Sequence, residues 1–281
     1  MAISRAKTGV KRTLLSRNVR PRKRLGQNFL VDSNVVAKVV RSAGLGAGDT
    51  VLEVGPGTGC LTQALAENAA TVVAVEFDKK MVAILSDTFK NAPNVRIVSA
   101  DILAFDETAL ARPYKVVANL PFYLTAPVIR KFLESKTPPT AMTLIVQKEV
   151  AQRICAKPPR MSILALSVQF YAAAAVIGYV SRGCFWPIPN VDSAIIRITP
   201  GPRRDADLAA AFFKVVRAGF SHPRKQLINN FSAAFPKCGR SVLESWLHGA
   251  GVAPAQRAET VGLEQWINLA NVHLTNTANN L

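Results

Sequence analysis

The middle of the chain alternates short apolar runs with segments of helical periodicity, and this alternation limits the possible folds more than any other feature. The runs are rich in β-branched residues and are as short as typical strands. They lie at residues 50–54, 71–75, 95–99, 114–118 and 141–146. Helical segments are expected between them at residues 61–68, 79–90 and 127–135. Such alternation predicts parallel βαβ units, with helices on both faces of a sheet. The expected class is therefore α/β.

The pattern changes on both sides of this region. Residues 172–180 and 193–198 are expected to pair as antiparallel strands. The segment 200–204, Pro-Gly-Pro-Arg-Arg, is typical of a linker, and the periodicity beyond it is helical. We therefore expect a basic arm over residues 1–23, an α/β domain over 24–200 and a small all-helical domain over 203–281.

Positive charge is concentrated at the start of the chain. The net charge is +17, and residues 1–31 carry nine Lys or Arg and no acid. Basic arms of this kind bind polyanions through counterion release, so Arg22, Lys23 and Arg24 are predicted to contact RNA. A disordered, solvated tail is an alternative. An organelle transit peptide is a second alternative, which Pro21 and the basic cluster at 22–24 disfavour because they interrupt an amphipathic helix.

Other features exclude several classes of protein. The four cysteines are far apart and form no CxxC pair, so we expect neither a metal site nor a disulfide framework. The longest apolar stretch, residues 163–180, is interrupted by polar residues and lacks the roughly 18 consecutive apolar residues of a membrane helix. We expect a reduced, cytoplasmic protein without membrane contact, and a monomer, since nothing suggests an obligate oligomer.

Three consecutive predicted strands end in residues suited to a nucleoside cofactor. Gly55, Gly57 and Gly59 follow the first strand, Glu76 ends the second and Asp101 ends the third. Glycines let the backbone approach a ligand, and an acid at the second strand can accept both ribose hydroxyls. Asp101 can accept a proton from the adenine amine of the cofactor. The alternatives are a tight strand-to-helix turn, a surface acid and a helix cap.

The sequence Asn119-Leu120-Pro121-Phe122 follows the fourth strand and suits a flat base with an exocyclic amine. The Asn119 side-chain oxygen can accept one amine proton, and the carbonyl of Leu120 or Pro121 can accept the other. Phe122 or Tyr123 can stack on the base. Together with the glycine turn, this motif predicts methyl transfer from S-adenosylmethionine to an adenine amine. A turn asparagine and a core phenylalanine are the alternatives.

Three further segments are candidates for the same reaction. Phe185 can cover the other face of an extruded base or can simply plug the core. Arg224 and Lys225 precede a helix and can contact phosphates, or they can belong to a solvated face. The segment 27–30, Gln-Asn-Phe-Leu, can form a lid over the cofactor or a hydrophobic staple.

These motifs together resemble the small-subunit ribosomal RNA adenine-N6,N6-dimethyltransferase family, in order and approximate spacing from Arg24 onward. The resemblance implies a class I (Rossmann-like) methyltransferase domain followed by a helical RNA-binding domain. It implies a substrate of two adjacent adenosines in the 3′-terminal hairpin loop of small-subunit rRNA, each methylated twice during 30S assembly. It also implies a set of ligands to S-adenosylmethionine. They are Asn28, Leu30, Gly55, Glu76, Asp101 and Asn119.

The chain departs from the family pattern at two positions. Phe122 stands where tyrosine is frequent, and Trp186 stands where a smaller residue is usual. Two related functions stay open. The antibiotic-resistance methyltransferases of large-subunit rRNA share Asn-[Leu/Ile]-Pro-aromatic, but residues 191–194 and the Arg224-Lys225 pair favour the small-subunit enzyme. Mitochondrial transcription factors of this fold bind nucleic acid without catalysis. The presence of Glu76, Asp101 and Asn119 argues against such a purely binding role for this chain.

The basic arm yields a direct prediction. Deleting residues 1–20 should weaken RNA binding and flatten the dependence of log Kd on log salt concentration, because fewer counterions are released. Filter binding over a salt series measures both quantities. An unchanged slope would show that the arm touches no phosphate.

Overall fold

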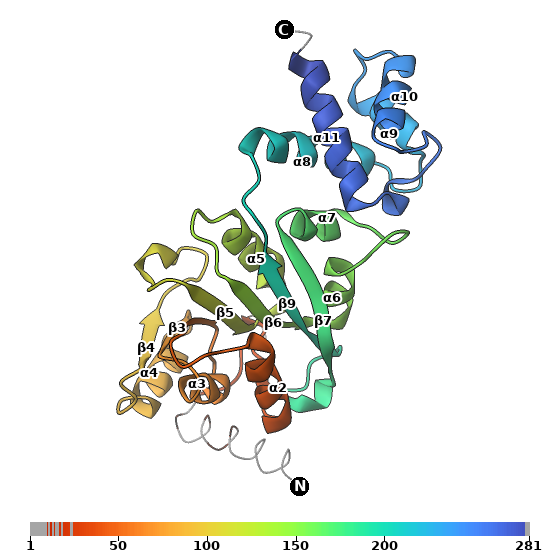
Figure 1. Ribbon diagram of the computed structural model, residues 1–281. Helices are drawn as coiled ribbons and strands as arrows, with labels where there is room; N and C mark the ends of the chain where they lie inside the picture. The colour runs from red at the N-terminus through yellow and green to blue at the C-terminus, as the bar shows by residue number, and fades with distance from the viewer. Residues whose placement is uncertain are drawn as a thin grey trace. The chain divides into compact units, whose positions relative to one another are not determined.

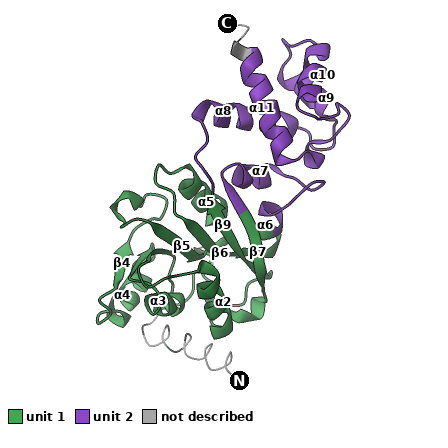
Figure 2. Cartoon of the chain, in the orientation of Figure 1, with its two compact units in different colours: residues 1–151, 174–200 green, residues 152–173, 201–281 purple. Residues whose placement is uncertain are grey.

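The chain folds into two compact units, shown in different colours in Figure 2. The computed structural model describes residues 10, 12, 14, 17, 19–22 and 25–278. The first unit comprises residues 1–151 and 174–200, and the second comprises 152–173 and 201–281. Residues 152–173, which the sequence placed with the α/β part, thus cluster with the helical part.

A seven-stranded sheet forms the centre of the first unit, in the order β4-β3-β2-β5-β6-β9-β7 (Figure 1). β2 to β6 pair in parallel, and β9 runs antiparallel to β6. This arrangement confirms the predicted α/β class, and β9 and β7 are neighbours as expected. The strands are β2 (Thr50–Val54), β3 (Thr71–Glu76), β4 (Val95–Ser99), β5 (Tyr114–Asn119), β6 (Ala141–Gln147), β7 (Ala172–Val180) and β9 (Ser193–Pro200).

Helices that follow the strands cover the sheet, and local signals set their ends. Asp32 caps α2, since its Oδ1 accepts the N–H groups of Asn34 and Val35. Gly44, with a φ of 59°, ends the same helix. Apolar faces of α2 and α3 pack on the sheet around Val51, which is fully buried. The helices are α2 (Ser33–Ala43), α3 (Cys60–Ala66), α4 (Lys79–Thr88), α5 (Thr125–Glu134) and α6 (Lys148–Ile154).

A two-stranded ladder outside the main sheet joins two segments that are far apart in the sequence. β1 (Phe29–Leu30) pairs antiparallel with β8 (Phe185–Trp186), so that Phe29 faces Trp186 and Leu30 faces Phe185. From the sequence, the first segment was expected to form either a lid or a hydrophobic staple, and Phe185 in the second was expected either to cover a base or to plug the core. Two-residue strands are too short to carry a periodic signal, so the pairing was not predictable.

The second unit is helical, as expected, around a core that includes Phe170, Phe212 and Trp266. The rings of Phe170 and Phe212 stack at 4.1 Å, which places α7 with the later helices. Gly219 is required by packing, because a Cβ there would collide with the Trp266 ring. The helices are α7 (Ile163–Gln169), α8 (Ala206–Gly219), α9 (Leu227–Ala234), α10 (Arg240–Gly249) and α11 (Leu263–Ala278). α6 and α7 were not predicted from the sequence, and α11 was expected only as part of a helical region.

Short 3-10 turns complete the secondary structure. They are η2 (Glu107–Ala109), η3 (Phe122–Leu124), η4 (Arg182–Cys184) and η5 (Ala258–Thr260). Among the described helices, none has both the length and the apolar character that crossing a bilayer requires.

The described residues of the N-terminal arm pack against α4. Leu14 and Val19 are buried in one cluster with Met81, Leu85 and other residues of that helix. Arg17 forms an ion pair with Asp87, also on α4. Apolar contacts therefore anchor these residues to α4, which a purely solvated tail would not show.

Candidate active site

A cavity of about 310 Å³ lies where β2, β3 and β5 end. Ligands of open α/β sheets bind at these carboxyl ends, and the volume is in the range of small-molecule sites, about 300–1,000 Å³. Most of the predicted site residues line it. They are Asn28, Gly55, Gly57, Glu76, Asp101, Asn119, Leu120, Pro121, Phe122 and Phe185. Leu30 instead lines a second cavity of about 30 Å³, together with Gly55, Gly57 and Asn119.

The glycine turn after β2 has a backbone that other residues adopt only with strain. Gly55, Gly57 and Gly59 have φ values of 67°, 57° and 82°. A Cβ on Gly57 would lie 2.9 Å from the Phe29 ring, so this position is filled by the protein itself. A Cβ on Gly55 would meet nothing within 4 Å. The backbone at Gly55 therefore borders open space in which a ligand can approach it.

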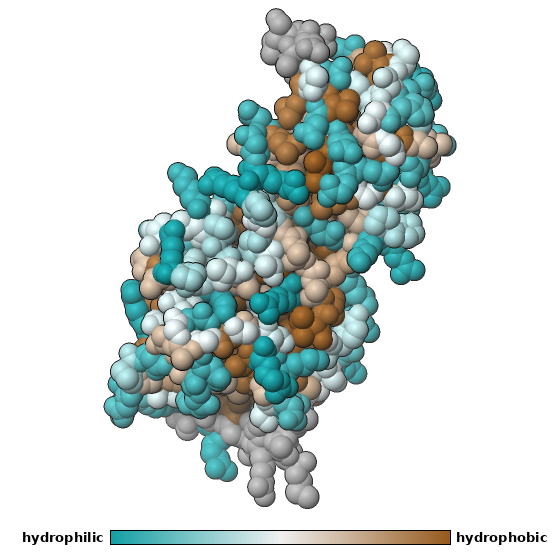
Figure 3. Space-filling view, in the orientation of Figure 1, coloured by the Kyte–Doolittle hydropathy of each residue, from teal (hydrophilic) through white to brown (hydrophobic). Residues whose placement is uncertain are grey.

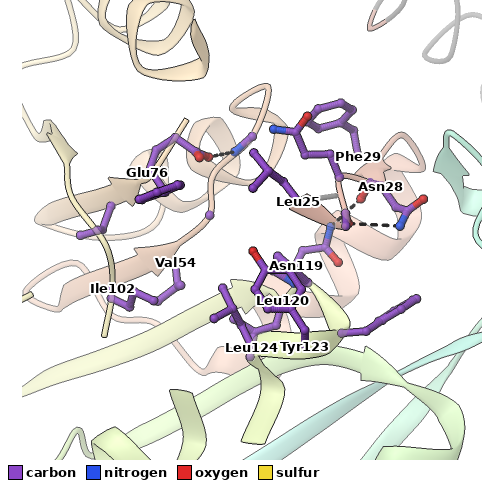
Figure 4. Close-up of a pocket in the computed structure, with 18 of the residues that line it drawn as sticks. Leu25, Asn28, Phe29, Val54, Glu76, Ile102, Asn119, Leu120, Tyr123 and Leu124 are labelled. Atoms are coloured by element: carbon purple, nitrogen blue, oxygen red, sulfur yellow. Dashed lines mark hydrogen bonds between the residues drawn. The ribbon is translucent and has the colours of Figure 1, made fainter. Parts of the chain in front are cut away.

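Glu76 is held rigidly at the end of β3. Its Oε2 accepts the N–H of Gly57 at 3.2 Å (Figure 4). Its Oε1 accepts the N–H of Asp78 at 2.8 Å. Burial raises the pKa of this carboxyl group, and the two hydrogen bonds oppose that effect. A carboxyl group fixed at both oxygens presents its remaining lone pairs in one direction, as recognition of a ribose diol requires.

Asp101 makes a local turn contact at the edge of the cavity. Its Oδ1 accepts the N–H of Leu103 at 2.9 Å, which is a local turn contact. The same residue is exposed and lines the cavity. The turn thus fixes a carboxylate at the cavity wall.

Asn119, the last residue of β5, has its amide oriented by the backbone of the N-terminal segment. Its Nδ2 donates to the carbonyl of Asn28 at 3.0 Å, and the Asn28 side chain in turn donates to the carbonyl of Gly26 at 3.2 Å (Figure 4). Because the amide nitrogen is engaged, Oδ1 is the atom available to accept a proton from a ligand. The sequence analysis did not predict this contact.

The turn after Asn119 distinguishes the two candidate carbonyl acceptors. The carbonyl of Pro121 accepts the N–H of Leu124 at 3.0 Å within η3. Leu120 donates its N–H to Ile145 at 3.2 Å, and no hydrogen bond to its carbonyl is found among the described residues. The carbonyl of Leu120 is therefore the better acceptor for a ligand.

The aromatic candidates differ in exposure. Phe122 is partly buried, Tyr123 is 56% exposed and Phe185 is only 2% exposed. The pairing of β8 with β1 holds Phe185 in the core cluster of α2 and α3 while part of the residue borders the cavity. Phe122 and Tyr123 are thus the more accessible surfaces for stacking.

One aromatic at the cavity escaped the sequence analysis. Phe77 lines the cavity with 65% of its surface exposed. It directly follows Glu76 at the end of β3. An aromatic residue immediately after a strand-ending acid is a signal that could have revealed it.

The N-terminal segment is tied to the cavity through Asp78, the cap of α4. Gln27 donates from Nε2 to Asp78 Oδ2 at 3.1 Å and accepts the N–H of Arg22 at 2.8 Å. Arg22 Nη1 lies 3.5 Å from the same carboxylate oxygen. Arg22 is thus exposed but partly paired, while Lys23 and Arg24 lie outside the described residues.

The other predicted RNA contacts, Arg224 and Lys225, are exposed just before α9. The first N–H groups of this helix are occupied, since Leu227 donates to Gln256 at 2.8 Å and Ile228 donates to Pro254 at 3.2 Å. Any phosphate here would therefore meet the side-chain charges rather than the amides of the helix terminus.

Comparison with known proteins identifies the family. The model of the ribosomal RNA adenine dimethylase family matches residues 18–274. The chain belongs to this family. Ribosomal RNA small subunit methyltransferase A of Dehalococcoides mccartyi (strain CBDB1) is 44% identical over 256 residues, which cover 89% of this chain and 88% of the relative. The protein of the same name from Lactococcus lactis subsp. lactis (strain IL1403) is 41% identical and covers 90% of both chains.

Solved structures agree with this assignment. The 23S rRNA methyltransferase ErmE superposes with a TM-score of 0.73 at 28% identity, over 87% of this chain and 99% of its own. A dimethyladenosine transferase from Plasmodium falciparum gives 0.74 at 20% identity, over 90% of this chain and 98% of its own, and shows the fold alone. The family and the Rossmann-like fold expected from the sequence are confirmed.

Glu53, in the middle of the glycine-turn motif, is 1% exposed, and burial raises its pKa to about 8. Its Oε2 has no hydrogen-bond partner among the described residues. The folded state therefore holds a proton that the unfolded chain loses above its ordinary pKa of 4.5. The stability that this proton provides is complete below about pH 4.5 and is lost as the pH rises to about 8.

We predict that Glu53→Gln becomes progressively more stable than the parent protein across this pH window, because glutamine carries no charge to desolvate. Thermal unfolding of the cofactor-free protein at about pH 5, 7 and 9 measures the effect. Glu134→Gln, on the exposed face of α5, is the matched control. A constant stability difference for Glu53→Gln over this range would contradict the buried, protonated state.

Proposed function

We propose that this protein transfers methyl groups from S-adenosylmethionine to N6 of two adjacent adenosines in the 3′-terminal hairpin loop of small-subunit rRNA. The product is N6,N6-dimethyladenosine. The protein acts as a cytoplasmic monomer on the assembling 30S subunit. The observation that carries the proposal is the Asn119 amide, whose nitrogen is bound by Asn28 at the mouth of a cavity of about 310 Å³.

The residues around the cavity fit the cofactor. When bound, S-adenosylmethionine supplies an electrophilic methyl group on a positively charged sulfur. Glu76 accepts from the ribose hydroxyls, and the open backbone at Gly55 allows close approach. Asp101 accepts from the adenine amine, and Phe77 offers an exposed ring beside Glu76. Two acids in the wall of the cavity, Glu76 and Asp101, favour a cationic ligand.

The target amine is prepared by two acceptors. Oδ1 of Asn119 and the carbonyl of Leu120 accept its two protons, which favours a tetrahedral nitrogen and frees the lone pair that adenine otherwise shares with its ring. Holding the amine in line with the methyl group would lower the activation free energy, because the two reacting groups would already be oriented. As the N–C bond forms, the S–C bond of the cofactor would break and leave S-adenosylhomocysteine. The cationic nitrogen would then release a proton to solvent, and until then the same acceptors would stabilise its charge.

Aromatic rings hold the base once it has left its stack. Phe122 and Tyr123 extend from the turn that carries the acceptors, so the stacking surface and the hydrogen-bonding groups share one rigid support. Phe185 borders the cavity from β8 and limits it on another side. Phe122 stands where the family frequently has tyrosine, so of the two rings at 122 and 123 only that of Tyr123 carries a hydroxyl group.

Large-subunit rRNA is the competing substrate, because ErmE, named a 23S rRNA methyltransferase, shares the fold at 28% identity. Identities of 41–44% to small-subunit methyltransferases over most of both chains favour the small subunit. Undermethylated 30S subunits and protein-free 23S rRNA separate the two. Mass spectrometry should detect N6,N6-dimethyladenosine in the 30S rRNA, whereas methylation of 23S rRNA alone would contradict the proposal.

The same assay tests Asn119. Asn119→Ala should reduce methyl transfer by at least about 100-fold, because the amine loses an acceptor in the transition state. Stability should fall by only about 1 kcal/mol, the worth of one neutral hydrogen bond. Asn94→Ala is the matched control, since the Asn94 amide bonds only backbone carbonyls of residues 66 and 69. Near-normal transfer by Asn119→Ala would remove this residue from the mechanism.

A further inference from the structure

Exposed apolar side chains gather around the mouth of the cavity. Single exposed apolar residues are normal, whereas a contiguous exposed apolar patch often marks a binding site. Phe77 and Tyr123 line the cavity, while Leu103 and Ile188 each neighbour a lining residue in the sequence. Ile188 is 58% exposed and is followed by Pro189, which lines the cavity. The surface beside the cavity is therefore unusually apolar for one that faces solvent.

Further exposed apolar side chains lie on β7, an edge strand of the sheet. Exposure alternates along the strand, so Ile177 and Tyr179 point to the same, uncovered face. Ile177 is 38% exposed and Tyr179 is 56% exposed. Figure 3 shows hydrophobic surface gathered over this strand.

Lys148 makes this surface cationic as well as aromatic. Its ammonium nitrogen lies 5.2 Å from the centroid of the Tyr179 ring, in a cation–π arrangement. Arg182, exposed in the turn after β7, adds a second cation. Because Tyr179 is 56% exposed, part of this residue is accessible to another flat group.

A chain of contacts connects this pair to the cavity. The backbone N–H of Lys148 donates to the carbonyl of Asp192 at 3.0 Å. The backbone N–H of Arg182 donates to the side-chain Oδ1 of Asp192 at 2.9 Å. The next residue, Ser193, lines the cavity and pairs with Gln147, which precedes Lys148. The Tyr179–Lys148 pair is thus built on the backbone that forms one wall of the site.

We propose that Tyr179 and Lys148 bind an unpaired nucleotide that flanks the target adenosine, with the base stacked on the ring and the phosphate near the ammonium group. Stacking on an aromatic ring beside a cation is the usual means of holding single-stranded RNA. Extrusion of one base leaves its neighbours unstacked, and they need a surface at the mouth of the cavity. The inference rests on the proposed function, because it assigns further substrate contacts to the same site.

The test measures Kd for undermethylated 30S subunits by filter binding and KM for the same particles in methyl transfer. Tyr179→Ala should raise both about 5- to 150-fold, the range that stacking of about 1–3 kcal/mol per base gives. Tyr179→Phe should restore them. Lys148→Gln should weaken binding and flatten its salt dependence, whereas Arg96→Gln, on the opposite edge strand β4, should do neither.

The outcomes separate this inference from the proposed function. Affinity for S-adenosylmethionine should be unchanged in the Tyr179 and Lys148 variants. Unchanged Kd and KM in Tyr179→Ala would overturn the inference while leaving methyl transfer intact. Full restoration by Tyr179→Leu would indicate apolar contact with a protein surface, which would also overturn it. Absence of methylation by the parent protein, in contrast, would refute the proposed function itself.

Discussion

The hydrogen bond from Asn119 Nδ2 to the carbonyl of Asn28 is the contact on which the rest of the site depends. It engages the donor half of the amide and leaves the acceptor half to face a ligand. It also joins the tip of β5 to the segment that leads into β1, whose ladder with β8 places Phe185 at the cavity. This hydrogen bond, together with the β1–β8 ladder, therefore connects the Asn119 amide, the N-terminal segment and β8.

The parallel sheet explains why these groups meet at all. Each of the parallel strands β2, β3, β4 and β5 ends in, or is followed by, one group of the site. These groups are, in the same order, the glycine turn, Glu76, Asp101 and Asn119. Parallel strands bring their carboxyl ends to one edge of the sheet. The site then uses local hydrogen bonds for orientation. Asp78 is the clearest case, because it caps α4, donates its N–H to Glu76 and accepts from Gln27.

Much of this arrangement was predictable from the sequence, since strands such as Thr50–Val54 and Val95–Ser99 combine β-branched residues with clear boundaries. The residues at strand ends followed from the same reasoning. The β1–β8 ladder and the Asn119–Asn28 contact depend on long-range pairing of short segments, which local pattern does not encode. The packing of α7 beside Phe212 likewise reflects tertiary contacts, which the apolar run at residues 163–180 did not reveal. Phe77 was missed although its position after Glu76 was visible.

A crystal structure of the protein with adenosine and S-adenosylhomocysteine tests the central claim most directly. The account predicts that N6 of the adenosine lies within about 3.2 Å of Asn119 Oδ1 and of the Leu120 carbonyl oxygen, with the base against Phe122 or Tyr123. An adenosine bound elsewhere, or an Asn119 amide that turns its nitrogen toward the base, would contradict it.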